Sequence, residues 1–184
     1  MAHKIKTVAV YCGHEFGLNP AFARDAGLMG ELIAQNGLNM VFGGGDVGLM
    51  GIVASAALNN GGHVTGISTN HVMAKQEPVH KNIEVKIARG VNERKQRMFE
   101  LSDAFIIMPG GIGTLNEATD ILTMQQIGET KKPLFFLNTC NFWESLYKLL
   151  LEMKRQTFLE EWADYIAFMG ETPQEIIDQI LKYK

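Results

Sequence analysis

The sequence predicts one α/β domain: a doubly wound parallel sheet with helices on both faces. Three observations point to it. Short runs that are apolar throughout alternate with longer segments of helical periodicity, as expected for strands covered on both sides. Glycines gather in clusters at 43–51, 61–66 and 110–113, between these segments. No composition shift, long linker or repeat divides the chain, so the predicted domain spans residues 1–184.

The first half of the chain opens with a strand over 7–12, where Thr-Val-Ala-Val-Tyr-Cys is β-branched and continuous and ends at Gly13. A helix over 20–36 follows, because Asn19-Pro20 is typical of a helix start and Gly37 of a helix end. The same alternation predicts the next four elements: a strand over 38–42, a helix over 48–60 rich in small residues, and strands over 63–67 and 83–87.

The second half begins with a helix over 91–102 and the most apolar strand, over 104–108. The elements expected after it are a helix over 114–127, a strand over 133–137, a helix over 142–154 and a strand near 165–168. Thr172-Pro173, with Glu175 behind it, predicts a capped final helix over 173–183. The whole is a Rossmann-like fold, whose ligands bind beyond the carboxyl ends of the strands. The glycine loops 43–51 and 110–113 are expected there.

Charge and composition narrow the class of protein. Seventeen basic and 20 acidic residues are interspersed, so the sequence lacks the basic stripe of a protein that binds nucleic acid. The apolar runs are shorter than the roughly 18 to 20 residues of a membrane span, and no signal peptide is evident. Two cysteines make no disulfide framework, which favours the cytoplasm. Cys12 and Cys140 are expected to be small buried hydrophobic residues.

The glycine loop 43–48 (Gly-Gly-Gly-Asp-Val-Gly) matches G-x-G-x-x-G between a strand and a helix. It follows the second strand, however, and no acid ends the third strand to hold a ribose diol. A Walker loop is excluded because no Gly-Lys-Ser/Thr follows. The loop therefore either lines a nucleotide site of another kind or only packs a helix tightly on a strand.

The loop from Pro109 to Glu117 enters a helix after the most apolar strand. Free amides at a helix start attract phosphate, glycines let the anion come close, and the Thr114 hydroxyl can add a hydrogen bond. Glu117 has two interpretations. It is either the N3 residue of a capping box opened by Thr114, or a carboxylate that faces the sugar of a bound ligand.

The charged run from Asn92 to Arg97 is either a solvated helix face or the source of a site residue. We expect Val91, Met98 and Leu101 to form the buried face, which puts Arg94 at its edge, where a guanidinium can grip phosphate or ribose oxygens. The five histidines have no metal-ligand spacing, so neither a metal nor any other cofactor is expected.

Taken together, these motifs resemble the LOG ("lonely guy") family of cytokinin riboside 5′-monophosphate phosphoribohydrolases. The segments that carry the resemblance are Gly43–Gly51, Glu93-Arg94-Lys95 and Pro109–Glu117, with Tyr11-Cys12-Gly13 and Asn19-Pro20. The match runs in order from about residue 7 to residue 180. Many relatives carry a lysine decarboxylase label, but no lysine here lies in a recognisable pyridoxal-phosphate site.

The resemblance implies hydrolysis of the N-glycosidic bond of an adenine-type nucleoside 5′-monophosphate, by a homodimer with its site near the subunit boundary. Arg94 and Glu117 match the family's catalytic pair. The residues that match its phosphate loop and other binding positions are Gly110, Gly111, Gly113, Thr114, Gly44, Gly45, Lys95 and Glu77.

Five residues depart from the family pattern: His14, Glu15, Asp46, Asn92 and Asn116. They put the selectivity for base and ribose in doubt more than the reaction. A different class of function also stays open, because non-catalytic nucleotide or molybdenum-cofactor carrier proteins resemble this fold and its glycine loops. A carrier has no evident need for Arg94 and Glu117 together.

Overall fold

The computed structural model describes residues 4–75, 80–159 and 167–183. Its strands form one seven-stranded sheet in the order β4-β3-β2-β1-β5-β6-β7, and every neighbouring pair is parallel. The strands are β1 (Thr7–Tyr11), β2 (Asn39–Phe42), β3 (Val64–Thr69), β4 (Val85–Ala88), β5 (Ala104–Ile107), β6 (Leu134–Leu137) and β7 (Ala167–Gly170). The predicted parallel α/β architecture is confirmed.

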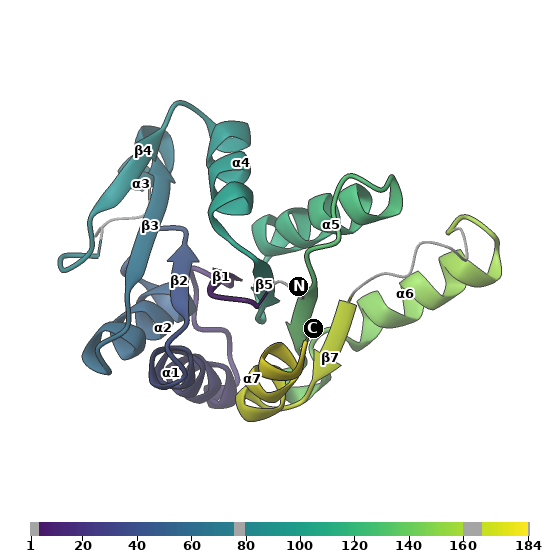
Figure 1. Cartoon of the computed structure of the whole chain (residues 1–184), viewed down its shortest axis with the longest axis horizontal. Coiled ribbons are helices and arrows are strands. Elements are labelled where there is room, and N and C mark those ends of the chain that lie inside the picture. Colours follow the sequence, from purple (N-terminus) through teal and green to yellow (C-terminus); the bar gives the residue numbers. More distant parts are fainter. Residues whose placement is uncertain (1–3, 76–79, 160–166, 184) are drawn as a thin grey trace.

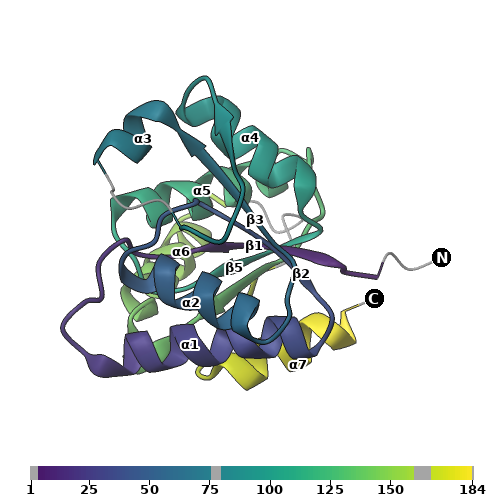
Figure 2. The same ribbon diagram turned by 90° about the vertical axis from the view of Figure 1, so that its left-hand side faces the viewer.

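Helices cover both faces of this sheet (Figures 1 and 2). The helices α1, α2 and α7 lie on one face, and α4, α5 and α6 lie on the other. Their bounds are α1 (Pro20–Gln35), α2 (Gly48–Asn59), α3 (Asn70–Lys75), α4 (Val91–Leu101), α5 (Ile112–Gln126), the 3-10 turn η1 (Thr139–Asn141), α6 (Glu144–Arg155) and α7 (Pro173–Lys182).

Alternation along the strands divides the interior into two cores. On β1, Val8 and Val10 belong to the core under α1, α2 and α7, whereas Ala9 and Tyr11 belong to the core under α4, α5 and α6. Successive side chains of a strand point to opposite faces, so a strand buried on both sides must be apolar at every position. This requirement explains the unbroken apolar runs of the sequence.

The sheet changes direction of winding at β1. The chain moves from β1 to β2 on one side, and from β5 to β6 on the other. Parallel sheets leave a crevice at such a point, beyond the carboxyl ends of the two central strands. Here Gly13 N donates to Pro109 O at 3.0 Å, which joins the loops after β1 and β5. The loops after β1, β2 and β5 therefore meet at one edge, as predicted.

One helix was not predicted, and several predicted boundaries differ from the structure. The helix α3 was not predicted, since it is a single short element directly after β3. The helix α5 begins at Ile112 and not at residue 114. The strand β4 begins at Val85, and the buried Ile83 precedes it in a turn. The last strand occupies 167–170, and the first half of the range expected for it lies outside the described residues.

Two predictions of burial are wrong. Cys140 is exposed, because it lies in η1 with a φ of 54° and its Sγ accepts a hydrogen bond from Asn19 Nδ2 at 3.3 Å. Cys12 is buried as expected, and burial raises the pKa of its thiol. On α4, Met98 is buried, but Val91 and Leu101, the first and last residues of the helix, are exposed. Arg94 shares the inner face with Met98, one turn away.

Candidate functional site

The site is centred on an ion pair between α4 and α5. Arg94 Nη1 donates to Glu117 Oε1 at 2.8 Å, and both side chains are nearly buried, at 13% and 11% exposure. The two residues lie on different helices and 23 positions apart in sequence. The structure therefore brings together the two residues predicted as the catalytic pair. Glu117 makes this tertiary contact and does not cap its own helix.

The Arg94 guanidinium lies against the backbone of β3 and of the loop after β2. Its Nε donates to Ile67 O of β3 at 3.0 Å. Its Nη2 lies so close to Gly43, directly after β2, that a Cβ at Gly43 would collide with it. The first glycine of the loop therefore makes room for the guanidinium. Two backbone contacts and one carboxylate fix the position of this charge.

Burial and charge act in opposite directions on Glu117. Desolvation raises the pKa of this carboxyl, and the neighbouring Arg94 and Lys95 oppose the rise without cancelling it. Tyr11, at the end of β1, has a raised pKa because it is buried, and the Glu117 charge adds to the effect. A carboxyl group with a raised pKa beside a fixed cation is typical of functional sites.

The start of α5 has the features of an anion site. Its first intrahelical bond runs from Leu115 N to Gly111 O, so the amides of Ile112, Gly113 and Thr114 have no acceptor within the helix. The N-cap residue Gly111 supplies no side chain, and a Cβ at Gly111 or at Gly113 would meet nothing within 4 Å. Space and free amides are therefore combined at the positive end of a helix dipole.

Thr114 has a different place from the one predicted. It lies in the first turn of α5 and not at its N-cap, and it is 4% exposed. Its Oγ1 packs against Gly110, so closely that a Cβ at Gly110 would collide with it. The predicted capping box is therefore wrong, because the N-cap residue is Gly111, three positions before Thr114, and the helix begins at Ile112. The hydroxyl lies under the loop, and Gly110 also approaches Gly13 of the neighbouring loop.

The loop after β2 packs against β4 and against His80. Gly44 has a φ of +83°, and a Cβ there would lie 2.8 Å from Val85 of β4. His80 N donates to Gly44 O, and its ring lies 2.9 Å from Ser55 Oγ of α2. Gly44 and Gly45 are both buried, so the close packing considered for this loop is present. Glu77, predicted to approach the ribose, lies outside the described residues.

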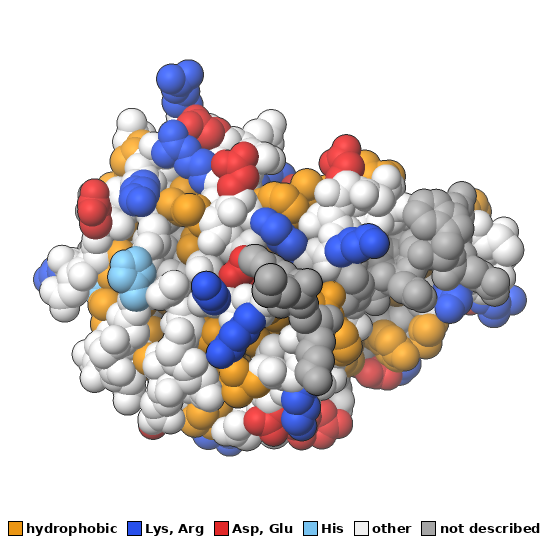
Figure 3. Space-filling model, viewed as in Figure 1, with side chains coloured by type: hydrophobic (Ala, Val, Ile, Leu, Met, Phe, Trp, Pro, Cys, Tyr) orange, Lys and Arg blue, Asp and Glu red, His pale blue; other side chains and the backbone are white. Residues whose placement is uncertain are grey.

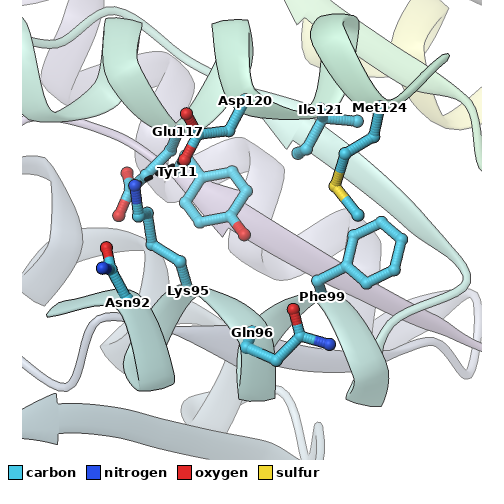
Figure 4. A pocket seen from close by; sticks show the side chains of 9 residues that line it. All are labelled: Tyr11, Asn92, Lys95, Gln96, Phe99, Glu117, Asp120, Ile121 and Met124. Atoms are coloured by element: carbon cyan, nitrogen blue, oxygen red, sulfur yellow. Dashed lines mark hydrogen bonds and ion pairs between the residues drawn. The ribbon is translucent and has the colours of Figure 1, made fainter. Parts of the chain in front are cut away.

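A cavity of about 210 Å³ opens beside Glu117, between α4 and α5. Lys95 crosses its edge, where Nζ contacts Asp120 Oδ2 at 2.5 Å and Asn116 Oδ1 at 3.0 Å. Figure 4 shows the Tyr11 ring between the two helices and the Lys95–Asp120 pair on the side of Glu117. The residues that line the cavity are Tyr11, Asn92, Lys95, Gln96, Phe99, Glu117, Asp120, Ile121 and Met124.

Several residues of this site were not predicted as site residues. Tyr11 belongs to a predicted buried strand and to the Tyr11-Cys12-Gly13 segment of the family resemblance, but nothing in the sequence assigned it a role in the site, and Asp120 is only a polar position of a helix. Gln96 belongs to the charged run of α4. These residues come together because α4 and α5 lie side by side over β1. That arrangement depends on the strand order and not on a local motif. Gly43 was part of the predicted loop, but its contact with Arg94 is long-range.

Charged side chains of both signs are interspersed on the surface shown in Figure 3. Over the β4–α4 end of the face in Figure 3, Lys and Arg side chains alternate with Asp and Glu. Within residues 4–75, 80–159 and 167–183, no group of three His, Cys, Asp or Glu side chains is placed to hold a metal ion. No helix in the same ranges combines the length and the apolar character that a membrane crossing requires.

Comparison of the sequence with known proteins gives consistent matches. Residues 50–180 match a family described as "Possible lysine decarboxylase". The cytokinin riboside 5′-monophosphate phosphoribohydrolase LOG of Oryza sativa subsp. japonica is 33% identical over 183 residues, which cover 98% of this chain and 74% of that protein. A cytokinin riboside 5′-monophosphate phosphoribohydrolase of Arabidopsis thaliana is 31% identical over 181 residues, covering 98% of this chain and 83% of the relative.

Solved structures match the fold. The molybdenum cofactor binding protein of Rippkaea orientalis has a TM-score of 0.69 to this chain, at 23% identity, over 97% of this chain and 96% of that one. At this identity the likeness shows a shared Rossmann-like architecture and nothing about the ligand.

Proposed function

The chain belongs to the LOG family of phosphoribohydrolases, and from this premise we propose that it hydrolyses the N-glycosidic bond of adenine-type (cytokinin) nucleoside 5′-monophosphates. The products are the free base and ribose 5-phosphate. The relatives are named for this activity. We extend it to this chain because Arg94 and Glu117 match the family's catalytic pair. AMP is the simplest substrate of the class.

In the proposed complex, the 5′-phosphate binds at the start of α5. The amides of Ile112, Gly113 and Thr114 donate to it, and the open space at Gly111 and Gly113 admits it. Gly44, Gly45 and Lys95 line the approach to the sugar, as the family resemblance implies, and Glu77 contacts the ribose. Glu117 lies one turn further along α5, which brings its carboxylate to the anomeric carbon when the phosphate is bound.

The reaction breaks the bond between the anomeric carbon and the base nitrogen. The bonding electron pair leaves with the base, which takes up a proton, and positive charge develops on the sugar as in glycoside hydrolysis. The Glu117 carboxylate stabilises this charge and accepts a proton from the attacking water, whose oxygen forms the new bond. Arg94 holds Glu117 in place. Phosphate binding at a distance from the reacting bond keeps the sugar in a reactive pose.

The observation that carries this proposal is the buried Arg94–Glu117 pair beside the free amides of α5. A helix cap would have explained Glu117 without any ligand, but Gly111 occupies the N-cap position. A carrier protein for a nucleotide or molybdenum cofactor remains the second candidate. The likeness to such proteins is one of fold, so the ion pair favours the enzyme.

A turnover assay tests the proposal. The protein is incubated with AMP and with isopentenyl-AMP, and adenine or isopentenyladenine and ribose 5-phosphate are measured. We expect both products in equal amounts. Glu117→Gln should lose turnover and keep phosphate binding. The control is Glu152→Gln on α6, which removes an exposed carboxylate far from the site in the sequence and should keep full turnover.

Two results would count against the enzyme. Release of no base from either nucleotide, with tight binding of one of them, would favour the carrier. Loss of phosphate binding in Glu117→Gln, with unchanged turnover of each bound substrate, would make Glu117 a structural residue of α5.

We further propose that the chain acts as a cytoplasmic homodimer that does not bind nucleic acid. Support for an interface comes from large apolar side chains exposed on or next to α4 and α5: Val91, Leu101, Ile112 and Ile127. Light scattering during gel filtration tests the oligomeric state, and a monomer at micromolar concentration would contradict it.

Retention on heparin at physiological salt would contradict the absence of nucleic-acid binding, and cell fractionation tests the compartment.

A further inference from the structure

We propose that the cavity between α4 and α5 receives the base, and that Gln96 selects a base with an exocyclic amino group. This inference rests on the proposed function, since it extends the same site from the sugar to the base. It assigns a role to Gln96, which lies in the charged run of α4 but had no role in the predicted site or in the ion pair. It also names a selectivity, namely for adenine over hypoxanthine.

The position of the cavity matches the order of groups in a nucleotide. The free amides lie at the start of α5, Glu117 follows, and the cavity extends beyond Glu117 to Ile121 and Met124. A helix rises 1.5 Å per residue, so Gly113, Glu117 and Ile121 are spaced about 6 Å apart along its axis. Phosphate, sugar and base of a 5′-nucleotide follow one another at similar steps. A nucleotide laid along α5 from its anchored phosphate therefore places its base in this cavity.

The walls of the cavity suit a flat heteroaromatic ring. Tyr11 and Phe99 present aromatic rings, and Ile121 and Met124 supply the apolar wall on α5 (Figure 4). Aromatic side chains stack on the faces of bases, and this contact does not distinguish one base from another. Selectivity must therefore come from polar groups that meet the edge of the ring.

Gln96 is a polar group at the edge of the cavity. Its Nε2 donates to Glu100 Oε1 at 2.8 Å, one turn further along α4. This bond assigns the amide so that the oxygen Oε1 remains for a ligand. Figure 4 shows that oxygen pointing toward the cavity and the nitrogen pointing away along the helix. Gln96 thus presents its amide oxygen as a hydrogen-bond acceptor at the cavity edge (Figure 4).

An acceptor discriminates between the two purines. The 6-amino group of adenine donates to it, whereas the 6-carbonyl oxygen of hypoxanthine faces it with a second acceptor. One hydrogen bond contributes a net 0.5 to 1.5 kcal/mol, so we expect AMP to bind about tenfold more tightly than IMP. Replacing Gln96 by leucine keeps the approximate size of the side chain and removes the acceptor, which should bring the two affinities to within about twofold.

The test measures affinity and not turnover. Dissociation constants of AMP and IMP are measured by calorimetry on the Glu117→Gln background, so that no nucleotide is consumed, with and without Gln96→Leu. The matched control is Gln174→Leu on α7, which breaks the same kind of bond, from Gln174 Nε2 to Asp178 Oδ1 at 2.8 Å. It should leave the AMP preference unchanged. Thermal unfolding of each variant checks that the fold is retained.

Each outcome decides the matter. Loss of the AMP preference in Gln96→Leu alone supports the inference. Equal binding of AMP and IMP before the substitution, an AMP preference that survives it, or no binding of either nucleotide overturns it. A protein that binds AMP selectively but releases no adenine contradicts the proposed hydrolysis and leaves the role of Gln96 intact, so the two failures are distinguishable.

Discussion

At the scale of single residues, the position of the Arg94 guanidinium depends on the absence of a side chain at Gly43. The Nη2 atom occupies the place that a Cβ would take, while Nε is bonded to Ile67 O and Nη1 to Glu117. An added methyl group must therefore displace the guanidinium from these two hydrogen bonds. Displacement of Arg94 also removes the guanidinium that donates a hydrogen bond to Glu117 Oε1.

We predict that Gly43→Ala lowers kcat/KM for AMP by about a hundredfold, since small misplacements of positioned groups have effects of this size. The measurement is steady-state kinetics of base release, together with circular dichroism to show that the fold remains. Gly90→Ala is the control. Gly90 precedes the same helix, has an extended backbone, and has nothing within 4 Å of an added Cβ. A fully active Gly43→Ala variant would contradict this account of the Arg94 position.

The pKa of Glu117 leads to a prediction about pH. Burial raises this pKa above the ordinary value of 4.5. If the carboxylate is the reactive form, kcat/KM should increase with pH and reach its plateau above a pKa higher than 4.5. The free energy of unfolding should move the other way. The folded state keeps the proton to a higher pH than the unfolded state, so stability declines as the pH rises from 4.5 through the raised pKa.

Two measurements check this sign. A pH profile of kcat/KM locates the acidic limb, and urea unfolding at several pH values compares the protein with Glu117→Gln, which should lack the decline. An acidic limb at or below pH 4.5 would mean that Arg94 dominates over burial.

The sequence could identify Arg94 and Glu117 as candidates but could not decide between their two interpretations. Arg94 lies in a run of charges that is typical of a solvated face, and Glu117 follows Thr114 at the spacing of a capping box. Both ambiguities are local, and the contact that removes them is tertiary. The ion pair is visible only when α4 and α5 are placed on the same face of the sheet.

At the scale of elements, two helix starts show when a local pattern is sufficient. Thr172 Oγ1 accepts a hydrogen bond from Glu175 N at 3.3 Å, and Glu175 Oε2 accepts from Glu171 N at 2.8 Å, so the predicted cap of α7 is confirmed. Thr114 and Glu117 have the same spacing on α5, but a buried charge pair is stronger than a cap. The α7 start is exposed, and no long-range partner competes for Glu175 within the described residues.

We predict that Thr172→Ala lowers the free energy of unfolding by about 1 kcal/mol, the usual loss for an N-cap, and leaves kcat/KM unchanged. Urea unfolding monitored by circular dichroism measures the change. The control is Thr123→Ala, whose hydroxyl bonds back to Thr119 O inside α5 and caps nothing. It should have a smaller effect, because a hydroxyl bonded within a helix contributes little to its stability. Equal losses in the two variants would show that the Thr172 hydrogen bond is not a functioning cap.

At the scale of the whole molecule, the architecture was predictable because one physical requirement acts on every strand. Strands such as β1 and β5 are buried on both faces, so nearly every position is apolar. A parallel sheet between two helical layers is the arrangement that buries both faces of such strands. The cavity between α4 and α5 was not predictable. It depends on how far apart these helices lie across β1, and helical periodicity contains no information about that spacing.

The site joins the two halves of this sheet. Arg94 and the loop after β2 belong to the half that runs from β1 to β4, whereas Glu117 and the anion-binding start of α5 belong to the half that runs from β5 to β7. A ligand that contacts both halves should stabilise the whole fold. At a concentration a hundred times its Kd, a ligand that binds only the folded state adds about 2.7 kcal/mol to the unfolding free energy.

We therefore predict that ribose 5-phosphate raises the unfolding temperature in one cooperative transition and slows hydrogen exchange in both β2 and β6. Ribose without phosphate should have little effect at the same concentration, because it lacks the group that binds the α5 amides. Scanning calorimetry and exchange mass spectrometry make the measurements, and sodium sulfate at equal ionic strength controls for salt. Equal stabilisation by ribose and ribose 5-phosphate would remove the start of α5 from the site. Protection confined to β6 would mean that the phosphate binds there without bringing the sugar to Arg94.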